Sequence, residues 1–215
     1  SYKRAIDINP KYSDAHNNLG IVYLDSKDLD KAVEHFKLAI SCNSDFAEAH
    51  NNLGSTLQQK GLLEEALNSY KKSITLKSDF SQAHNNMGIL LQKLGNNEAA
   101  ISSYENAIAH EPLYASAHHN LSAIKTYAEH DAQISQMKSI LSTAGISLAN
   151  KAQLCFALAK ANEDLGNKDE LFEFLNEGNR LRNNELNFSI DNHNILIKSL
   201  FEKPLPSIRK TSFDS

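Results

Sequence analysis

One short stretch decides the fold of this chain: the hexapeptide AHNNLG at residues 15–20. It returns as AHNNLG at 49–54, as AHNNMG at 83–88 and, in weaker form, as AHHNLS at 117–122. The offset is 34 residues each time. Self-similarity at a fixed offset of this size is typical of proteins built by stacking copies of one small unit.

The second half of each unit has the spacing of an amphipathic helix. Ala32, Phe36, Ala39 and Ile40 stand at i, i+4, i+7 and i+8, which places them on one helical face. The same face returns in the next two units as Ala66, Tyr70, Ser73 and Ile74, and as Ala100, Tyr104, Ala107 and Ile108. Glycines break the pattern between the two halves, at Gly61 and Gly95. Each unit is therefore predicted to be a hairpin of two helices.

Two finer features support this interpretation. Small residues recur where the two helices of a hairpin come closest, namely Gly20, Gly54 and Gly88. Asp45, followed three residues later by Glu48, also fits a capping box that starts the first helix of the second unit. A lone hairpin cannot bury its apolar face, so neighbouring hairpins must stack.

This pattern resembles the tetratricopeptide repeat family, whose unit is a 34-residue helix–turn–helix, here with Pro10 and Pro112 at unit ends. The resemblance implies an all-α fold, a right-handed α-solenoid of stacked helical hairpins. One departure is that histidine replaces the bulky aromatic residue common near the start of the first helix. These histidines are His16, His50 and His84.

The period divides the chain into segments. They are 1–12, the second helix of a truncated repeat; 13–46, 47–80 and 81–114, three full repeats; 115–149, an atypical repeat; 150–185, a degenerate repeat; and 186–215, a C-terminal helix and linker. Because the chain opens inside a repeat, we expect it to be a fragment of a longer protein.

The period breaks after residue 120, since Lys125 stands where earlier units carry Tyr23, Leu57 and Leu91. Beyond this point we expect a helix over 131–144 capped by Gly145, a helix ended by Gly166, and another that runs through Arg182. A separate last helix is predicted from Ser189 to Phe201.

The segment 131–203 resembles the repeat region that precedes the catalytic domain in bacterial tetratricopeptide–sulfotransferase proteins. The likeness lies in FALAKANEDLG at 156–166, EGNRLR at 177–182 and LNFSI at 186–190. It implies a catalytic domain beyond Ser215. The chain itself has no glycine-rich loop of the kind that holds a phosphate or sulfonucleotide. We therefore predict no enzyme activity and no cofactor for these residues.

Composition limits which partners the protein can bind and in which cellular compartment it is expected. The net charge is -4, so there is no broad basic surface for nucleic acid. Apolar runs such as Ile195-Leu196-Ile197 fall far short of the ~20 residues that cross a bilayer. Two cysteines without a C-x-x-C pattern, Cys42 and Cys155, and the lack of a secretory leader indicate a cytoplasmic setting in which both thiols only pack.

Four histidines share one register, His16, His50, His84 and His118, and could be taken for metal ligands. Equivalent residues on stacked helices lie roughly 10 Å apart, whereas His–Zn bonds are about 2 Å long. We therefore predict no metal site and expect these rings to pack within the hairpins.

The asparagines of the repeated hexapeptide are the candidate binding residues. At about 100° per residue, His16, Leu19 and Tyr23 form the buried stripe and the asparagines fall outside it. Amides both donate and accept hydrogen bonds, so they suit the backbone of an extended peptide. The candidates are Asn17, Asn18, Asn51, Asn52, Asn85, Asn86, His119 and Asn120. The alternative is that these amides only solvate the surface or bridge adjacent repeats.

In the family, first helices line the inner surface of the solenoid. The column Asn18, Asn52, Asn86 and Asn120 resembles the asparagine ladder of protein-glycosylating transferases, whose repeats grip extended peptides. The lysines of a carboxylate clamp are missing at the positions of Asn17, Asn51 and Asn85, which disfavours recognition of an acidic C-terminus.

The sequence therefore predicts a non-catalytic scaffold that binds a protein or an extended peptide in an asparagine-lined groove. The alternative is an accessory region that presents an acceptor to the catalytic domain of a sulfotransferase. Solenoid ends expose apolar faces, so we also expect weak self-association through them.

Overall fold

The computed structural model describes the backbone of residues 2–201 and the side chains of residues 2–185, so the linker predicted after residue 201 lies outside the described residues. The described part is helical and contains no strand. Its helices are α1 (Tyr2–Ile8), α2 (Ser13–Asp25), α3 (Leu29–Cys42), α4 (Ala47–Gln59), α5 (Leu63–Leu76), α6 (Ser81–Lys93), α7 (Asn97–His110), α8 (Ala115–Ser122), α9 (Ala132–Leu141), α10 (Leu148–Leu165) and α11 (Lys168–Phe201). The predicted α-solenoid is confirmed.

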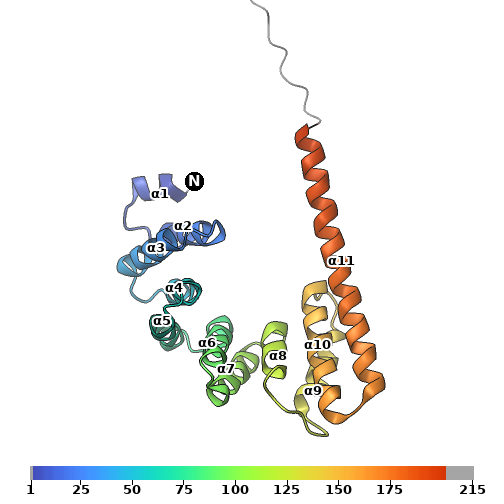
Figure 1. The fold of residues 1–215 in the computed structure, drawn as a ribbon. Helices are drawn as coiled ribbons and strands as arrows, with labels where there is room; N and C mark the ends of the chain where they lie inside the picture. The colour runs from blue at the N-terminus through green and yellow to red at the C-terminus, as the bar shows by residue number, and fades with distance from the viewer. Residues whose placement is uncertain (1, 202–215) are drawn as a thin grey trace, which may run out of the picture.

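The hairpins stack into a curved row with one hollow side (Figure 1). The first helices of neighbouring repeats contact one another, α2 with α4, α4 with α6 and α6 with α8. The second helices α3, α5 and α7 each pack between the first helices before and after them and lie on the outer side of the curve (Figure 1). The first helices therefore line the concave face.

Each hairpin is closed by a glycine that faces an aromatic ring. An ideal Cβ built on Gly20 would lie 2.7 Å from Phe36, one on Gly54 would lie 2.8 Å from Tyr70, and one on Gly88 would lie 2.5 Å from Tyr104. All three rings are almost fully buried, with exposed fractions of 0%, 1% and 0%. The predicted positions of closest approach are thus confirmed, and only glycine fits them.

The turn between the two helices of a repeat requires a left-handed residue. Gly61 and Gly95 have φ of 80° and 79°, and the first repeat places Lys27 there, with φ of 64°. A side chain in this conformation costs roughly 1–2 kcal/mol because Cβ crowds the following carbonyl.

Exchanging the two residue types at this turn should therefore have opposite effects. Lys27→Gly is expected to raise the free energy of unfolding by about 1 kcal/mol, and Gly95→Ala to lower it by a similar amount. Urea titrations of both variants test this. Two changes of the same sign would contradict the role assigned to the turn.

The predicted capping box at the start of the second repeat is wrong. Helix α4 begins at Ala47 after Phe46, whose side chain makes no capping hydrogen bond. Asp45 instead belongs to the preceding turn, where its backbone N–H donates to the Asn43 side chain at 3.1 Å. Glu48 accepts from Lys77 Nζ at 3.0 Å.

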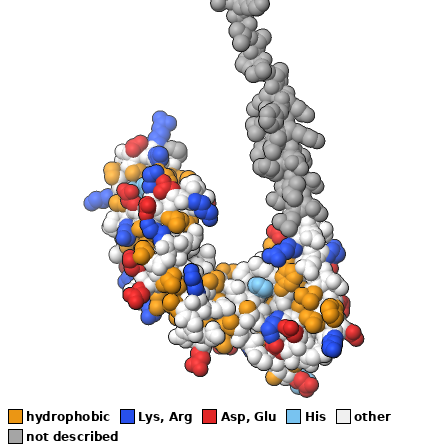
Figure 2. All heavy atoms as spheres, in the orientation of Figure 1, with side chains coloured by type: hydrophobic (Ala, Val, Ile, Leu, Met, Phe, Trp, Pro, Cys, Tyr) orange, Lys and Arg blue, Asp and Glu red, His pale blue; other side chains and the backbone are white. Residues whose placement is uncertain are grey.

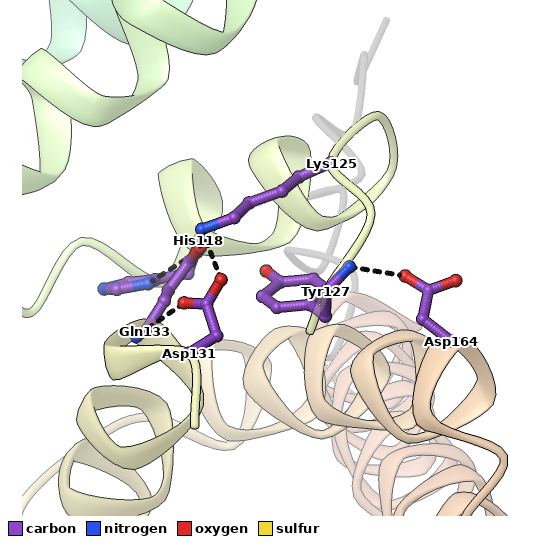
Figure 3. A network of polar contacts seen from close by, with 6 residues as sticks. All are labelled: His118, Lys125, Tyr127, Asp131, Gln133 and Asp164. Atoms are coloured by element: carbon purple, nitrogen blue, oxygen red, sulfur yellow. Dashed lines mark hydrogen bonds and ion pairs between the residues drawn. The ribbon is translucent and has the colours of Figure 1, made fainter. Parts of the chain in front are cut away.

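A polar network holds the chain where the period breaks (Figure 3). Lys125 Nζ lies 2.8 Å from Asp131 Oδ2, and Gln133 Nε2 lies 3.3 Å from Nδ1 of the buried His118. The backbone N–H of Tyr127 donates to Asp164 Oδ2 at 3.1 Å. Helix α8 ends at Ser122, and these contacts hold the segment that leads from it to α9.

The last two helices agree only in part with the sequence prediction. Helix α10 ends at Gly166, which has φ of 73°, as expected. Helix α9 ends at Leu141, so Gly145 lies beyond its cap, in a turn with φ of 85°. A separate helix from Ser189 is wrong, because α11 runs unbroken over Lys168–Phe201. No glycine or proline stands between Gly178 and Pro204 to stop it.

Candidate functional site

The asparagines of the repeated hexapeptide form pairs between repeats. Nδ2 of Asn52 donates to Asn17 Oδ1 at 3.0 Å, that of Asn86 to Asn51 Oδ1 at 3.0 Å, and that of Asn120 to Asn85 Oδ1 at 2.9 Å. Each pair joins the first helix of one repeat to the first helix of the next. We call these pairs the amide ladder.

The two members of each pair differ in burial, which corrects the sequence prediction. The acceptors Asn17, Asn51 and Asn85 are only 7%, 1% and 4% exposed, so the expectation that they lie outside the buried stripe is wrong. The next repeat covers them. The inner residues Asn18, Asn52, Asn86 and Asn120 are partly exposed. Bridging of adjacent repeats, the alternative left open by the sequence, therefore does occur.

The inner amides of the ladder keep unused hydrogen-bonding groups. Each donor in a pair uses one N–H, and the side-chain carbonyls of Asn52, Asn86 and Asn120 have no partner among the described residues. The bond to the preceding repeat fixes how each amide is turned. These inner amides are thus oriented before any ligand arrives.

A hollow of about 220 Å³ lies beside the ladder on the concave face. It is lined by Ser55 and Gln58 of α4, by Tyr70 of α5, and by Asn86 and Ile89 of α6. The Tyr70 hydroxyl donates to Gln58 Oε1 at 3.0 Å, and Tyr104 repeats the contact with Gln92 at 2.9 Å. Burial raises the pKa of Tyr104 to about 12, so this hydroxyl stays a donor at neutral pH.

The four histidines in register fasten the turns between repeats. Their Nε2 atoms lie within hydrogen-bond distance of a backbone carbonyl six residues earlier: His16 with Pro10 at 3.1 Å, His50 with Ser44 at 3.2 Å, His84 with Ser78 at 2.9 Å and His118 with Pro112 at 3.0 Å. Sequence reasoning missed this contact. Its signal was available, because histidine and turn recur with the same 34-residue period.

Burial of three histidine rings, His35, His50 and His118, makes the fold sensitive to acid. Burial lowers the pKa of His118 and of His50, against an opposing hydrogen bond to a backbone carbonyl in each case. Burial also lowers the pKa of His35, whose Nδ1 lies 3.2 Å from His16 Nδ1. The folded state therefore favours the neutral rings.

Stability should consequently fall as the medium is acidified. The unfolded chain binds protons at His35, His50 and His118 near pH 6.5, whereas the folded chain resists doing so at these rings until lower pH. The contribution is complete above pH 6.5 and is lost as the pH falls from there toward the folded pKa values. Urea midpoints measured from pH 7.5 downward test this, and His118→Gln should reduce the slope. A midpoint that stays constant or rises on acidification would contradict it.

The histidines and cysteines in the described part of the chain bear on metal binding and on thiol chemistry. No group of three or more His, Cys, Asp or Glu side chains there is arranged to hold a metal ion. Cys155 is buried, and burial raises the pKa of its thiol to about 11, so it stays protonated at neutral pH.

His119, the remaining candidate, stands one period after Asn85 but is not part of the ladder. It is partly exposed and contacts the Phe156 ring of α10, with 6.4 Å between ring centroids. Burial lowers its pKa, Arg182 lowers it further, and a backbone contact with Gln153 acts in the opposite direction. The ring is therefore neutral near pH 7.

The surface seen in Figure 2 differs between the repeats and the last helices. Over α6 and α8 it shows mostly uncharged side chains with apolar ones among them, whereas charged groups of both signs and a patch of apolar side chains lie over the last helices.

Comparisons with known families agree with this repeat architecture. Residues 57–95 match a model described as TPR repeat, and residues 81–112 match one described as tetratricopeptide repeat. Residues 57–112 therefore match tetratricopeptide-repeat models. Residues 1–61 also match a model described as the Est1 DNA/RNA binding domain. That segment holds seven Lys and Arg against eight Asp and Glu, so the absence of a nucleic-acid partner stays our prediction.

Solved tetratricopeptide structures resemble the chain in fold. A structure of YrrB, titled a TPR protein with an unusual peptide-binding site, matches with a TM-score of 0.59 and 16% identity, covering 86% of this chain and 94% of YrrB. A MamA structure matches with 0.58 and 22%, covering 82% and 94%. The first TPR of Spaghetti (RPAP3), bound to the HSP90 peptide SRMEEVD, matches with 0.51 and 18%, covering 52% and 89%. No curated protein sequence matches the chain.

Among the described residues, no helix combines the length and apolar character needed to cross a bilayer.

Proposed function

We propose that the concave face of these tetratricopeptide repeats is a non-catalytic scaffold that binds an extended segment of a protein partner. The observation that carries the proposal is the amide ladder, because it presents oriented, partly exposed amides at one position of each successive repeat. Structures with the same fold that are titled as peptide-binding or peptide-bound support the proposal.

The ladder matches an extended backbone in chemistry and in spacing. Each inner amide can accept a backbone N–H through its carbonyl and donate its second N–H to a backbone C=O. Neighbouring helices lie about 8–10 Å apart and an extended chain rises ~3.4 Å per residue, so one repeat spans two to three peptide residues. In this proposal Asn18, Asn52, Asn86 and Asn120 contact the ligand directly. Asn17, Asn51 and Asn85 position the last three of them.

The side chains of the ligand contribute less to recognition in this proposal. The hollow beside Asn86 is lined by one apolar residue, Ile89, and by neutral polar groups. It accommodates a small uncharged side chain without selecting a charge. The scaffold is therefore tolerant of sequence along the ladder.

The test compares two substitutions that break the same hydrogen bond. Asn86→Ala removes an inner amide, and Asn51→Ala removes only its buried partner. Each leaves one polar group unpaired and should cost a similar amount of stability, about 1–3 kcal/mol. Peptides selected from a random linear library on the unmodified chain are then measured by fluorescence polarisation, at a temperature where all three proteins are folded.

We expect Asn86→Ala to reduce the affinity for these peptides roughly tenfold, because one or two hydrogen bonds to the peptide are lost. Asn51→Ala should reduce the affinity less. If both variants lose the same peptide affinity, the amide ladder has only a structural role. If the library yields no peptide that binds the unmodified chain, the proposal of a peptide-binding scaffold is wrong.

None of the matches above concerns a sulfotransferase. The accessory role implied by the resemblance of residues 131–203 stays a prediction, as do the cytoplasmic setting and self-association through the solenoid ends.

A further inference from the structure

A second hollow lies where the first helices meet the last helix pair. Its volume is about 170 Å³, and it is lined by His119 of α8, by Gln153 and Phe156 of α10, and by Arg182 and Glu185 of α11, with Ala149 and Ala152 completing the wall. At about 30 Å³ per water molecule, this is room for roughly five waters or one amino-acid side chain.

Hydrogen-bond donors without partners meet at this hollow. Arg182 forms no ion pair with any side chain that the structure describes. Nδ1 of His119 is buried and has no hydrogen-bond partner among the described residues, so it can donate to an anion in the tautomer that carries its proton there. Oε1 of Gln153 accepts from Ser116 at 3.0 Å, which leaves the amide N–H groups of Gln153 for a ligand. An anion would satisfy all three residues.

An apolar ring lies beside both nitrogen-bearing groups. Phe156 lies 6.4 Å from the His119 ring and 5.7 Å from the guanidinium carbon of Arg182. The alanines beside it are small and partly or fully buried. Electrostatic attraction is stronger at such a surface than in bulk water, so a bound anion gains more from Arg182 there.

The hollow adjoins the end of the amide ladder. Asn120, the neighbour of His119 in α8, donates to Asn85 in the last pair of the ladder. Ser116, one turn earlier in α8, holds Gln153 of α10. A peptide that follows the inner amides therefore reaches this hollow next.

We infer that the hollow at His119, Gln153 and Arg182 binds a carboxylate of the peptide held by the concave face. The inference rests on the proposed function and names the chemistry of one ligand residue. It also revises the expectation that carboxylates are disfavoured. The cations absent from the positions of Asn17, Asn51 and Asn85 are supplied here by a residue of the last helix.

Glu185 provides an internal control, because its carboxylate shares the hollow and repels an incoming anion. Removing this charge should strengthen binding, whereas removing the charge of Arg182 should weaken it. The two residues lie three positions apart on one exposed face of α11, so both substitutions should leave the fold intact.

The experiment titrates the full chain with three small probes and follows the His119 ring signals by NMR. N-acetyl-leucine carries a terminal carboxylate, N-acetyl-leucine amide carries none, and the α-amide of N-acetyl-glutamate carries one on its side chain. We expect at least one acidic probe to bind about tenfold more tightly than the neutral amide, the contribution of a charged hydrogen bond. The tighter acidic probe identifies the source as a chain terminus or an acidic side chain.

Arg182→Gln should remove this preference, and Glu185→Gln should increase the affinity of the acidic probe severalfold. Equal binding of all three probes, or a preference that survives Arg182→Gln, would overturn the inference.

The carboxylate site in this hollow and peptide binding on the concave face can be tested separately. Asn86→Ala should leave the small probes unaffected, because Asn86 does not line the hollow. If library peptides bind equally well to the unmodified chain and to Arg182→Gln, the carboxylate site is rejected, while peptide binding by the concave face still stands. Acidic probes that bind through Arg182 support the hollow even where no extended peptide binds.

Discussion

Truncating Tyr70 to alanine is expected to lower the free energy of unfolding by about 3–5 kcal/mol. The ring is 1% exposed and fills the space that Gly54 leaves between α4 and α5. Its removal opens a cavity inside the second repeat that the two helices cannot close. Urea denaturation followed by circular dichroism measures the loss.

Tyr70→Phe is the matched control, because it keeps the ring and removes only the hydroxyl that donates to Gln58 at 3.0 Å. We expect a loss of about 1 kcal/mol. Phe36 already occupies the equivalent place beside Gly20, which shows that the repeat accepts a ring without a hydroxyl. Equal losses for the two variants would mean that the hydrogen bond, and not packing, closes the hairpin.

Gly88→Ala should also destabilise the chain, by about 1–3 kcal/mol, because the added methyl group overpacks the core. Its Cβ would lie 2.5 Å from the ring of Tyr104, which is fully buried and has no room to move. Helix propensity alone predicts the opposite sign, since alanine is favoured over glycine in a helix by about 1 kcal/mol. The sign of the measured change therefore decides between local propensity and packing.

A second background tests the mechanism of this effect. In a Tyr104→Leu chain the ring that meets the new methyl group is gone, and Gly88→Ala should then be neutral or stabilising. If the loss persists in that background, the glycine is required for a reason other than the approach of the ring.

The repeats could be predicted from the sequence because one local pattern recurs with its spacing intact. AHNNLG, the glycine turns and the apolar faces all follow the same period, so each copy supports the assignment of the others. Where the period fails, prediction fails with it. The separate last helix predicted from Ser189 to Phe201 lies outside the period, and α11 runs through this segment unbroken.

The burial of Asn17, Asn51 and Asn85 could not be predicted from one helix. A helical wheel shows which residues face the partner within a hairpin, but these amides are covered by the first helix of the next repeat. They lie beside the buried stripe, where a small rotation decides exposure. The hollow around Arg182 was hidden for a similar reason, because α8, α10 and α11 meet only in the fold.

The amide ladder has a consequence for how such a chain can change its copy number. In each repeat the first asparagine accepts a hydrogen bond from the following repeat, and the second asparagine donates one to the preceding repeat. An extra unit inserted between two others would find both partners already in place, and a deleted unit would leave its neighbours complementary. Duplication or loss of a repeat within this array thus needs no compensating substitution. The amide ladder ends at the fourth unit, where His119 replaces the acceptor asparagine.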